Sequence, residues 1–234
     1  MTVLRVATYN VHKCRGIDWR VDAHRILNVL LGLHADVIAV QEIFEEQARL
    51  LAGGLRVEHR FAPARTLAGR GYGNAVFSRL PIELCEVYDL TVSGREARNC
   101  IRVDVRCAPD SIIHHFALHL GTSFFERRKQ AIRLLSKDML AGNSLTGPRI
   151  VMGDFNEWSR GLVTQSLCKL MQSVDVHEHL GRRRTYPGTV PFLHLDHIYY
   201  DRPFRLHRLI LHRTTESLLA SDHLPLMAEL ELNV

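Results

Sequence analysis

The chain has 234 residues, of which 46% are hydrophobic and 24% are charged, and its formal net charge at pH 7 is +5. This length and composition predict one soluble α/β domain over residues 1–234 and exclude a low-complexity or fibrous chain. The mild basic charge favours anionic partners such as phosphates, nucleic acid or acidic lipid headgroups, without choosing among them.

Cysteine usage and the N-terminus bear on the compartment. The five cysteines are scattered without a CxxC pair, so we expect reduced thiols rather than a disulfide framework. The first ten residues alternate like a strand and lack the long apolar region of a secretion signal, and no run of the sequence is long enough to span a bilayer. These features predict a cytoplasmic protein.

The first elements in the chain are predicted to be a strand, a helix and a strand. Residues 3–10 alternate and deliver Asn10 to the end of a strand, a helix begins at Asp22, and residues 35–40 form a buried strand that ends before Glu42. A crossover helix makes the two strands parallel. Asn10 and Glu42 are therefore expected at the same edge of one sheet.

The middle of the chain is predicted to be rich in strands. A short helix over 45–51 is expected to stop at Gly53-Gly54, and residues 63–71, rich in Arg, Gly, Ala and Pro, predict a mobile cationic loop. Residues 98–106 alternate apolar with charged side chains, which predicts a half-exposed strand. Further strands are predicted over 72–78, from residue 80 onward, and over 112–120, where His114 and His115 are interpreted as structural.

The second half of the chain begins as the first half does. Ser123 and Glu126 form the pattern of a capping box that opens a long helix ending at Gly142, and a central strand follows at residue 150. A helix is predicted over 162–171, and strands over 194–200, 204–212 and 224–232. We therefore expect two similar halves that pack face to face.

The stretch from Ile150 to Asn156 is the centre of the predicted function. An apolar run leads into Gly153, which allows a sharp turn, and Asp154 and Asn156 follow. Ligands of open α/β sheets bind at this end of the strands. Polar side chains also follow the other predicted strands, which gives the set Asn10, Glu42, His119, Asp154, Asn156, Asp196, Asp222 and His223. Carboxylates for a hard cation, a histidine and amide donors are what phosphoryl transfer requires.

Seven segments carry a resemblance to a known family, and they are Thr8–His12, Gln41–Glu42, Tyr72–Ala75, Leu118–Leu120, Gly153–Asn156, Leu195–Ile198 and Ser221–Pro225. Their order resembles the endonuclease/exonuclease/phosphatase superfamily of deoxyribonuclease I-like, metal-dependent phosphohydrolases. The resemblance implies a four-layer α/β sandwich, in which two mixed β-sheets pack face to face with helices on the outside.

The resemblance also implies roles at a metal site. Glu42 resembles the principal ligand of Mg²⁺, with Mn²⁺ as an alternative ion, and Asn10 and Asp222 resemble residues of the first or second coordination shell. Since Mg²⁺ takes one or two carboxylates and keeps several waters, a sparse ligand set is expected.

Further roles concern the chemical step. His223 resembles the general base, Asp196 the carboxylate that orients its ring, and Asp154 the carboxylate that orients the nucleophile. Which of His223 and Asp154 takes the proton stays open. Asn156 and His119 resemble donors to the scissile phosphate.

Two residues are interpreted as contacts to the substrate, each with an alternative. Arg98 lies where relatives carry a phosphate-facing arginine, although a surface charge is the alternative. Asn74 either contacts the substrate or shapes the backbone of the site. His12 is left out of the site because alternation turns it away from its neighbour.

The substrate stays open among nucleic acid, a phospholipid and a small phosphoester. The basic loop and the Arg182–Arg184 run suit nucleic acid, while the absence of a long insertion and of a basic amphipathic helix disfavours a dedicated DNA or membrane binder. An inositol 5-phosphatase is not expected, because that subgroup carries Trp-Cys-Asp-Arg where this chain has Leu195–Ile198. A non-catalytic binding module is the alternative from another class. We expect a monomer without an obligate protein partner.

Overall fold

Two six-stranded sheets form the centre of the molecule. The computed structural model describes residues 2–109, 111–157, 161–173, 184–189 and 193–232. The strand orders are β11-β12-β1-β2-β4-β3 in one sheet and β5-β6-β7-β8-β10-β9 in the other. Both sheets are mixed, because β1–β2 and β7–β8 are parallel pairs and the other pairs are antiparallel. The predicted four-layer α/β sandwich is confirmed.

The strands of the first sheet are β1 (Thr2–Asn10), β2 (Val37–Phe44), β3 (Glu58–Leu67), β4 (Arg70–Ser78), β11 (Phe204–Leu211) and β12 (Leu226–Leu232). The second sheet contains β5 (Ile82–Asp89), β6 (Asn99–Ala108), β7 (Ser111–His119), β8 (Arg149–Asp154), β9 (Gln172–Ser173) and β10 (Asp196–Tyr200). The helices are η1 (His12–Cys14), α1 (Ala23–Leu33), α2 (Glu45–Leu55), α3 (Phe124–Leu134), α4 (Leu162–Leu170) and α6 (Thr215–Ala220).

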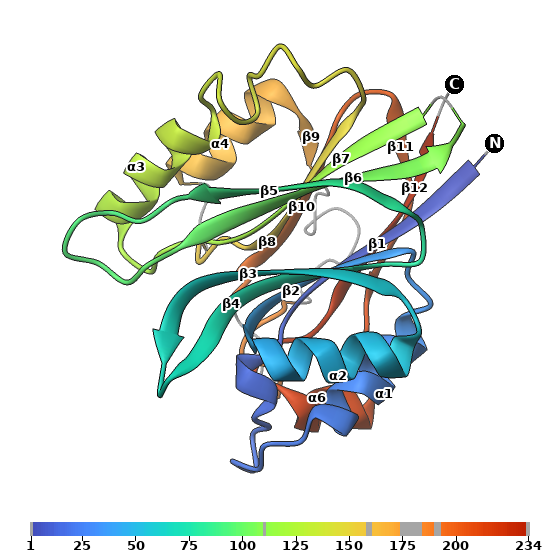
Figure 1. The fold of residues 1–234 in the computed structure, drawn as a ribbon, viewed down its shortest axis with the longest axis vertical. Coiled ribbons are helices and arrows are strands. Elements are labelled where there is room, and N and C mark those ends of the chain that lie inside the picture. Colours follow the sequence, from blue (N-terminus) through green and yellow to red (C-terminus); the bar gives the residue numbers. More distant parts are fainter. Residues whose placement is uncertain (1, 110, 158–160, 174–183, 190–192, 233–234) are drawn as a thin grey trace.

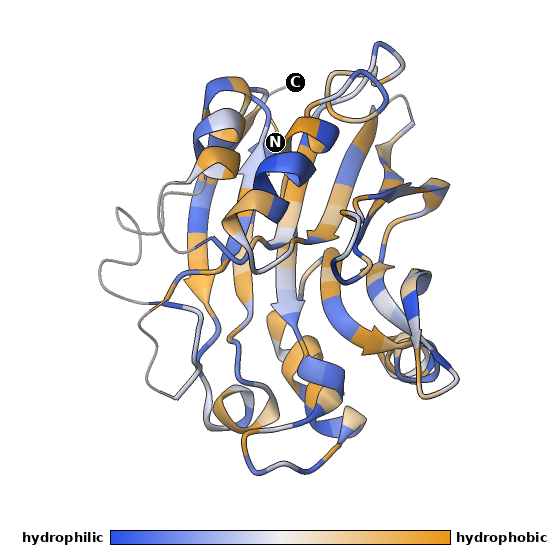
Figure 2. Ribbon diagram, turned by 90° about the vertical axis from the view of Figure 1, so that its left-hand side faces the viewer, coloured by the Kyte–Doolittle hydropathy of each residue, from blue (hydrophilic) through white to orange (hydrophobic). Residues whose placement is uncertain are grey.

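Helices cover the two outer faces, with α1, α2 and α6 on the first sheet and α3 and α4 on the second (Figure 1). Successive side chains of a strand point to opposite faces. Val6 of β1 and Met152 of β8 therefore lie in the core between the sheets, whereas Ala7 packs beneath α1. The strands accordingly show alternating bands of hydropathy (Figure 2). Among the described residues, no helix is long and apolar enough to cross a membrane.

The predicted parallel pair of the first sheet is present, and its register positions the site. Asp22 caps α1 by accepting hydrogen bonds from the backbone nitrogens of His24 and Arg25. The crossover through α1 makes β1 and β2 parallel, with Asn10 opposite Gln41. Asn10 and Glu42 therefore lie at the same sheet edge, as the topology predicts.

The prediction of a mobile loop over residues 63–71 is wrong. These residues belong to the β3–β4 hairpin, in which β3 continues to Leu67 and β4 starts at Arg70. Ala68 and Gly69 form the turn with φ values of 50° and 74°. Two positive φ values at a two-residue turn match the twist of the paired strands, which explains why an Arg- and Gly-rich segment is ordered here.

Two helix boundaries also differ from the prediction. Helix α2 continues through the two glycines to Leu55, because a Cβ at Gly54 would lie 2.3 Å from the side chain of Leu27 on α1. This glycine therefore permits close helix packing instead of ending the helix. Helix α3 ends at Leu134, far before Gly142, and residues 135–141 form turns and a bend.

The predicted capping box at the start of α3 is absent. The Ser123 side chain accepts no capping hydrogen bond, and Glu126 is buried instead of reaching back to the helix start. The prediction of a half-exposed strand at residues 98–106 is also wrong, because Arg102 and Asp104 are buried on β6. Apolar and charged residues do alternate in the sequence, but Arg102 and Asp104 pair with each other and are buried.

Candidate active site

The polar strand ends of both sheets meet at one end of the sandwich. In the second sheet, the register pairs His119 of β7 with Asp154 of β8, and Asp154 with Asp196 of β10. Gly153 makes the close approach of β7 and β8 possible, because a Cβ there would lie 1.9 Å from the Leu118 carbonyl oxygen, and its φ is 152°. The three neighbouring strand ends thus place a histidine and two carboxylates side by side.

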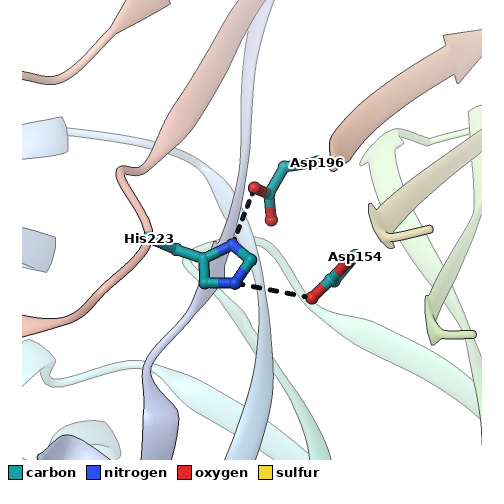
Figure 3. A group of neighbouring side chains, drawn as sticks. All are labelled: Asp154, Asp196 and His223. Carbon is teal, nitrogen blue, oxygen red and sulfur yellow. Dashed lines mark hydrogen bonds and ion pairs between the residues drawn. The ribbon is translucent and has the colours of Figure 1, made fainter. Parts of the chain in front are cut away.

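His223 lies between two carboxylates (Figure 3). Its Nδ1 is 2.9 Å from Oδ2 of Asp196, and its Nε2 is 3.7 Å from Oδ2 of Asp154. Burial disfavours the charged ring, but the negative charge and the hydrogen bond of Asp196, with Asp154 beyond, raise the pKa of His223 to about 10. When only the charges of the protein act on it, the ring is therefore an imidazolium.

Glu42 is aimed into the site by an irregularity of β2. The β2–β4 register shifts between Val40 and Ile43, and Glu42 has a φ of 57°. Bulges and left-handed residues re-aim side chains beside functional sites. Although burial raises the pKa of this carboxyl, the nearby His119 ring and hydrogen bonds from Asn10 and Tyr72 hold the pKa at about 2.

The side chain of Asn10 joins the two sheets. Its Nδ2 donates to Oε1 of Glu42 at 3.2 Å and to Oδ2 of Asp154 at 2.9 Å. Its Oδ1 accepts from the backbone nitrogen of His12 at 3.0 Å. The amide therefore presents its nitrogen to the two carboxylates and holds them near one another.

A second histidine, His119, lies near the same carboxylate oxygen of Asp154 as His223 does. Nε2 of His119 is 3.6 Å from Oδ2 of Asp154, and Nδ1 is 3.1 Å from Nη1 of Arg98. Burial and the Arg98 charge lower the pKa of His119 to about 4, so its ring is neutral at physiological pH. Asn156, at a φ of 50°, brings its Nδ2 to 3.1 Å from Nε2 of His119.

Arg98 and Asn74 take different places. The Arg98 guanidinium faces His119, and its Nε has no hydrogen-bond partner among the described residues. Asn74 donates to Oδ1 of Asn99 at 2.8 Å, and Asn99 donates to the carbonyl of Ala62 across the two sheets. The contacts of Asn74 match its alternative interpretation, in which it shapes the backbone of the site.

His12 was left out of the predicted site, but the structure brings it there. Its Nδ1 is 3.3 Å from Oδ1 of Asp222, and its Nε2 is 2.7 Å from Nη2 of Arg15. Since a guanidinium only donates, Nε2 accepts and the ring proton on Nδ1 faces Asp222. Strand alternation fails here because residues 12–14 form a turn with positive φ values.

Two tyrosines also belong to the surroundings of the site. The Tyr72 hydroxyl donates to Oε2 of Glu42 at 2.8 Å, and the Tyr186 ring centroid is 4.8 Å from that of His223. Tyr72 begins the segment Tyr72–Ala75, which carries part of the family resemblance, and this position was the sequence signal that could have placed it at the site. Of the predicted basic run, Arg182 and Arg183 lie outside the described residues.

The donor set fits a hard cation. Asp154, Asp196 and His223 each offer a ligand atom, and these atoms lie within 4.8 Å of one another. Glu42 and Asp222 add two more carboxylates around the same place. Oxygen-rich sites of this kind suit Mg²⁺ or Mn²⁺ better than soft metals.

Two face-to-face mixed sheets, with carboxylates and a His–Asp pair where their ends meet, define a hydrolase that acts on phosphoester bonds. Residues 7–223 match the Endonuclease/Exonuclease/phosphatase family, and the chain belongs to this family. The family is typically metal-dependent. The resemblance stated from the sequence is therefore confirmed.

Individual relatives agree with this assignment. The chain is 28% identical over 252 residues to a protein of Escherichia coli K12 named uncharacterized protein YbhP. The alignment covers 97% of this chain and 96% of that protein. An endonuclease/exonuclease/phosphatase family protein from Bacteroides thetaiotaomicron has the same fold, with a TM-score of 0.84, 19% identity, and coverage of 100% and 99%. A mannosyl-6-phosphatase from the same species has a TM-score of 0.82 at 19% identity, with coverage of 98% and 100%.

Proposed function

We propose that this protein is a Mg²⁺- or Mn²⁺-dependent phosphodiesterase or phosphatase in which the His223–Asp196 pair activates water for in-line attack on phosphorus. The observation that carries the proposal is the placement of His223. Asp196 binds Nδ1, while Nε2 faces Asp154 across 3.7 Å without another partner among the described residues. A ring nitrogen with no hydrogen bond of its own and an orienting carboxylate on the other side of the ring suits proton abstraction from water.

We propose that Glu42 and Asp154 hold the cation, with Asn10 and Asp222 supporting them. The Asn10 amide already bridges Glu42 and Asp154. Asp196 and His223 bond to each other, so using both as ligands would break the pair. A bound Mg²⁺ or Mn²⁺ would polarise a phosphoryl oxygen. Its positive charge would also offset the carboxylates that raise the pKa of His223, so that the ring would lose its proton and could serve as a base.

The remaining residues are assigned to the proton and to the phosphoryl oxygens. His223 takes the proton, Asp196 orients the ring and stabilises the imidazolium that forms, and Asp154 orients the attacking water. Asp154 is the alternative base. His119, Asn156 and Arg98 lie together and are proposed to donate to the phosphoryl oxygens as charge develops there.

The phosphoester itself is proposed only as a class that includes nucleic acid, phospholipid and small phosphoesters. The hairpin arginines favour nucleic acid less than the sequence suggested, because Arg65 is ion-paired with Glu96 and Arg70 with Glu46. We also propose that residues 1–234 act as one catalytic domain, since both sheets contribute to the site. We further propose that the protein is a monomer. Light scattering of the full chain tests the monomer.

Hydrolysis of bis(p-nitrophenyl) phosphate tests the proposal. Chelation should abolish turnover, and Mg²⁺ or Mn²⁺ should restore it. Glu42→Gln should weaken Mn²⁺ binding, measured by the loss of the free Mn²⁺ resonance, and should slow turnover. Glu58→Gln is a matched control, because Glu58 lies exposed at the far end of the same sheet. Turnover that persists in excess chelator contradicts the metal. A folded protein that binds a phosphate ligand without turnover supports the non-catalytic module instead.

A further inference from the structure

An exposed apolar cluster lies on the loop between η1 and α1. Ile17, Trp19 and Val21 are 38%, 75% and 65% exposed, and Leu219 of α6 is 41% exposed. The backbone nitrogen of Ile17 donates to the carbonyl of Leu219 at 3.2 Å, which places the two segments side by side. These four residues are called the apolar rim below. The loop projects at the lower edge of the molecule, below α1 and α6 (Figure 1).

The loop is firmly braced. Gly16 donates to the Arg20 carbonyl at 2.9 Å, and the Arg25 guanidinium binds the Asp18 carboxylate and the Leu219 carbonyl. Trp19 has a φ of 65°, a conformation that is an outlier for a bulky residue. The backbone of Trp19 is therefore strained while its side chain is exposed to solvent. Strained backbone conformations cluster at functional segments.

The apolar rim is connected to the active site on both sides. The Arg15 guanidinium lies 4.7 Å from the Trp19 ring centroid and binds His12, whose ring faces Asp222. Leu219 lies three residues before Asp222 in the chain. The apolar rim is therefore linked to Asp222 of the site through Arg15 and His12.

Charge around the apolar rim indicates what it contacts. Arg15 and Arg20 flank it, whereas the two acids of the loop are engaged, Asp18 with Arg25 and Asp22 with the start of α1. Apolar side chains with a tryptophan at their centre and cations at their edge match the boundary of an anionic bilayer.

Two other occupants fit less well. A single nucleic acid strand stacks its bases on open aromatic faces, but Arg15 already covers one face of Trp19, and its apolar neighbours are aliphatic. A second copy of the chain would bring like cations together.

We propose that the apolar rim docks the enzyme on a membrane surface that contains anionic phospholipid, and that the substrate is a phosphodiester in a lipid headgroup at that surface. This inference rests on the proposed phosphodiesterase function. A loop performs the docking, which explains why the sequence shows no amphipathic basic helix.

Vesicle sedimentation with the full chain tests the docking. The protein should sediment with vesicles of phosphatidylcholine and phosphatidylglycerol, more weakly with phosphatidylcholine alone, and less at high salt. In a Trp158→Phe background Trp19 is the only tryptophan, so its emission should shift to the blue when vesicles are added. A wild-type protein that stays in the supernatant at low salt overturns the proposal.

Variants distinguish docking through the apolar rim from nonspecific adsorption of the protein to vesicles. Trp19→Ser with Val21→Ser should weaken vesicle binding by at least about ten-fold, and Arg20→Gln by roughly five-fold on anionic vesicles only. Ile132→Ser is the matched control, because Ile132 is 67% exposed on α3 in the other outer layer. Equal binding by the Trp19/Val21 variant and the wild type overturns the assignment, as does a variant that loses only binding to single-stranded DNA.

A soluble substrate separates this inference from the proposed function. The Trp19/Val21 variant should hydrolyse bis(p-nitrophenyl) phosphate as fast as the wild type and should lose hydrolysis of a phosphodiester lipid in vesicles. If the wild type turns over the soluble substrate without binding vesicles, only the docking is wrong. If it binds vesicles without any turnover, the proposed function is wrong.

Discussion

Among the described residues, two buried Asp–His pairs are hydrogen-bonded through an aspartate of the second sheet, and only one of these pairs belongs to the site. Asp104 and His114 are 2.7 Å apart, and Asp196 and His223 are 2.9 Å apart. In the first pair every ring nitrogen has a partner, because Nε2 of His114 accepts from the backbone nitrogen of Gly147 at 3.1 Å. Arg102 also binds both carboxylate oxygens of Asp104, at 2.7 and 2.6 Å.

The second pair, Asp196 and His223, is called open because Nε2 of its histidine has no hydrogen bond among the described residues, whereas the first pair is called closed. Nε2 of His223 faces Asp154 across 3.7 Å, and Oδ1 of Asp196 has no hydrogen-bond partner among the described residues. An Asp–His pair therefore does not by itself indicate catalysis. What separates them is whether the second ring nitrogen is already bonded within the fold or is available to a water or a substrate.

The largest expected effect comes from removing the open nitrogen alone. His223→Asn keeps a donor near the position of Nδ1 for Asp196 and deletes Nε2. We expect turnover to fall by roughly 10²- to 10⁴-fold, which is the usual contribution of a general base. Steady-state kinetics on bis(p-nitrophenyl) phosphate measures the loss, and circular dichroism checks that the variant is folded.

The open pair should also act as a unit. Asp196→Asn should cost a large part of the same factor, because the amide can stabilise the wrong tautomer. The double variant should be little slower than His223→Asn. Losses that multiply would show that the two side chains act separately, and Asp154 would become the first candidate for the base.

Breaking the closed pair should affect stability instead of turnover. Asp104→Ala leaves the buried Arg102 guanidinium without its main partner, and removing one member of a buried ion pair costs about 3–5 kcal/mol. Urea unfolding should show this loss, whereas turnover per folded molecule should match the wild type. A large fall in turnover with unchanged stability would assign this pair to function.

A third buried histidine, His115, sharpens the comparison. Neither ring nitrogen of His115 has a partner among the described residues, and burial lowers its pKa from 6.5 to about 3. The folded state therefore binds the proton more weakly than the unfolded state does. The contribution of neutral His115 to the free energy of unfolding is fully present above pH 6.5 and is lost as the pH falls toward 3.

His115→Leu should remove this acid sensitivity. The difference in unfolding free energy between variant and wild type should grow by roughly 1.4 kcal/mol per pH unit below the ordinary pKa of histidine. Urea titrations at a series of pH values measure it. A constant difference across that range would mean that His115 keeps an ordinary pKa.

The smallest expected effect is the counterpart of the first variant. His114→Asn keeps a donor for Asp104 and removes the acceptor for Gly147. One lost hydrogen bond that leaves a backbone donor unpaired costs about 1–3 kcal/mol. Turnover should not change. Equal losses of turnover in His114→Asn and His223→Asn would contradict the distinction between closed and open pairs.

Much of the site could be predicted from the sequence because its residues follow strand ends. The strand–helix–strand order places Asn10 and Glu42 at one edge, and the register of β7, β8 and β10 brings His119, Asp154 and Asp196 together. His12 could not be predicted, since its ring is aimed by a turn with positive φ that alternation does not represent.

The sequence by itself determined the two sheets, the family and the strand-end set, because apolar alternation and motif order are local properties of the chain. Only the tertiary structure decided which Asp–His pair is closed. His114 and Gly147 are separated by 33 residues in the sequence, and the backbone nitrogen of Gly147 donates the hydrogen bond that occupies Nε2 of His114. Asp196 and His223 meet from different strand ends, and Asp154 comes close without bonding. Long-range packing sets these distances, and no local pattern encodes them.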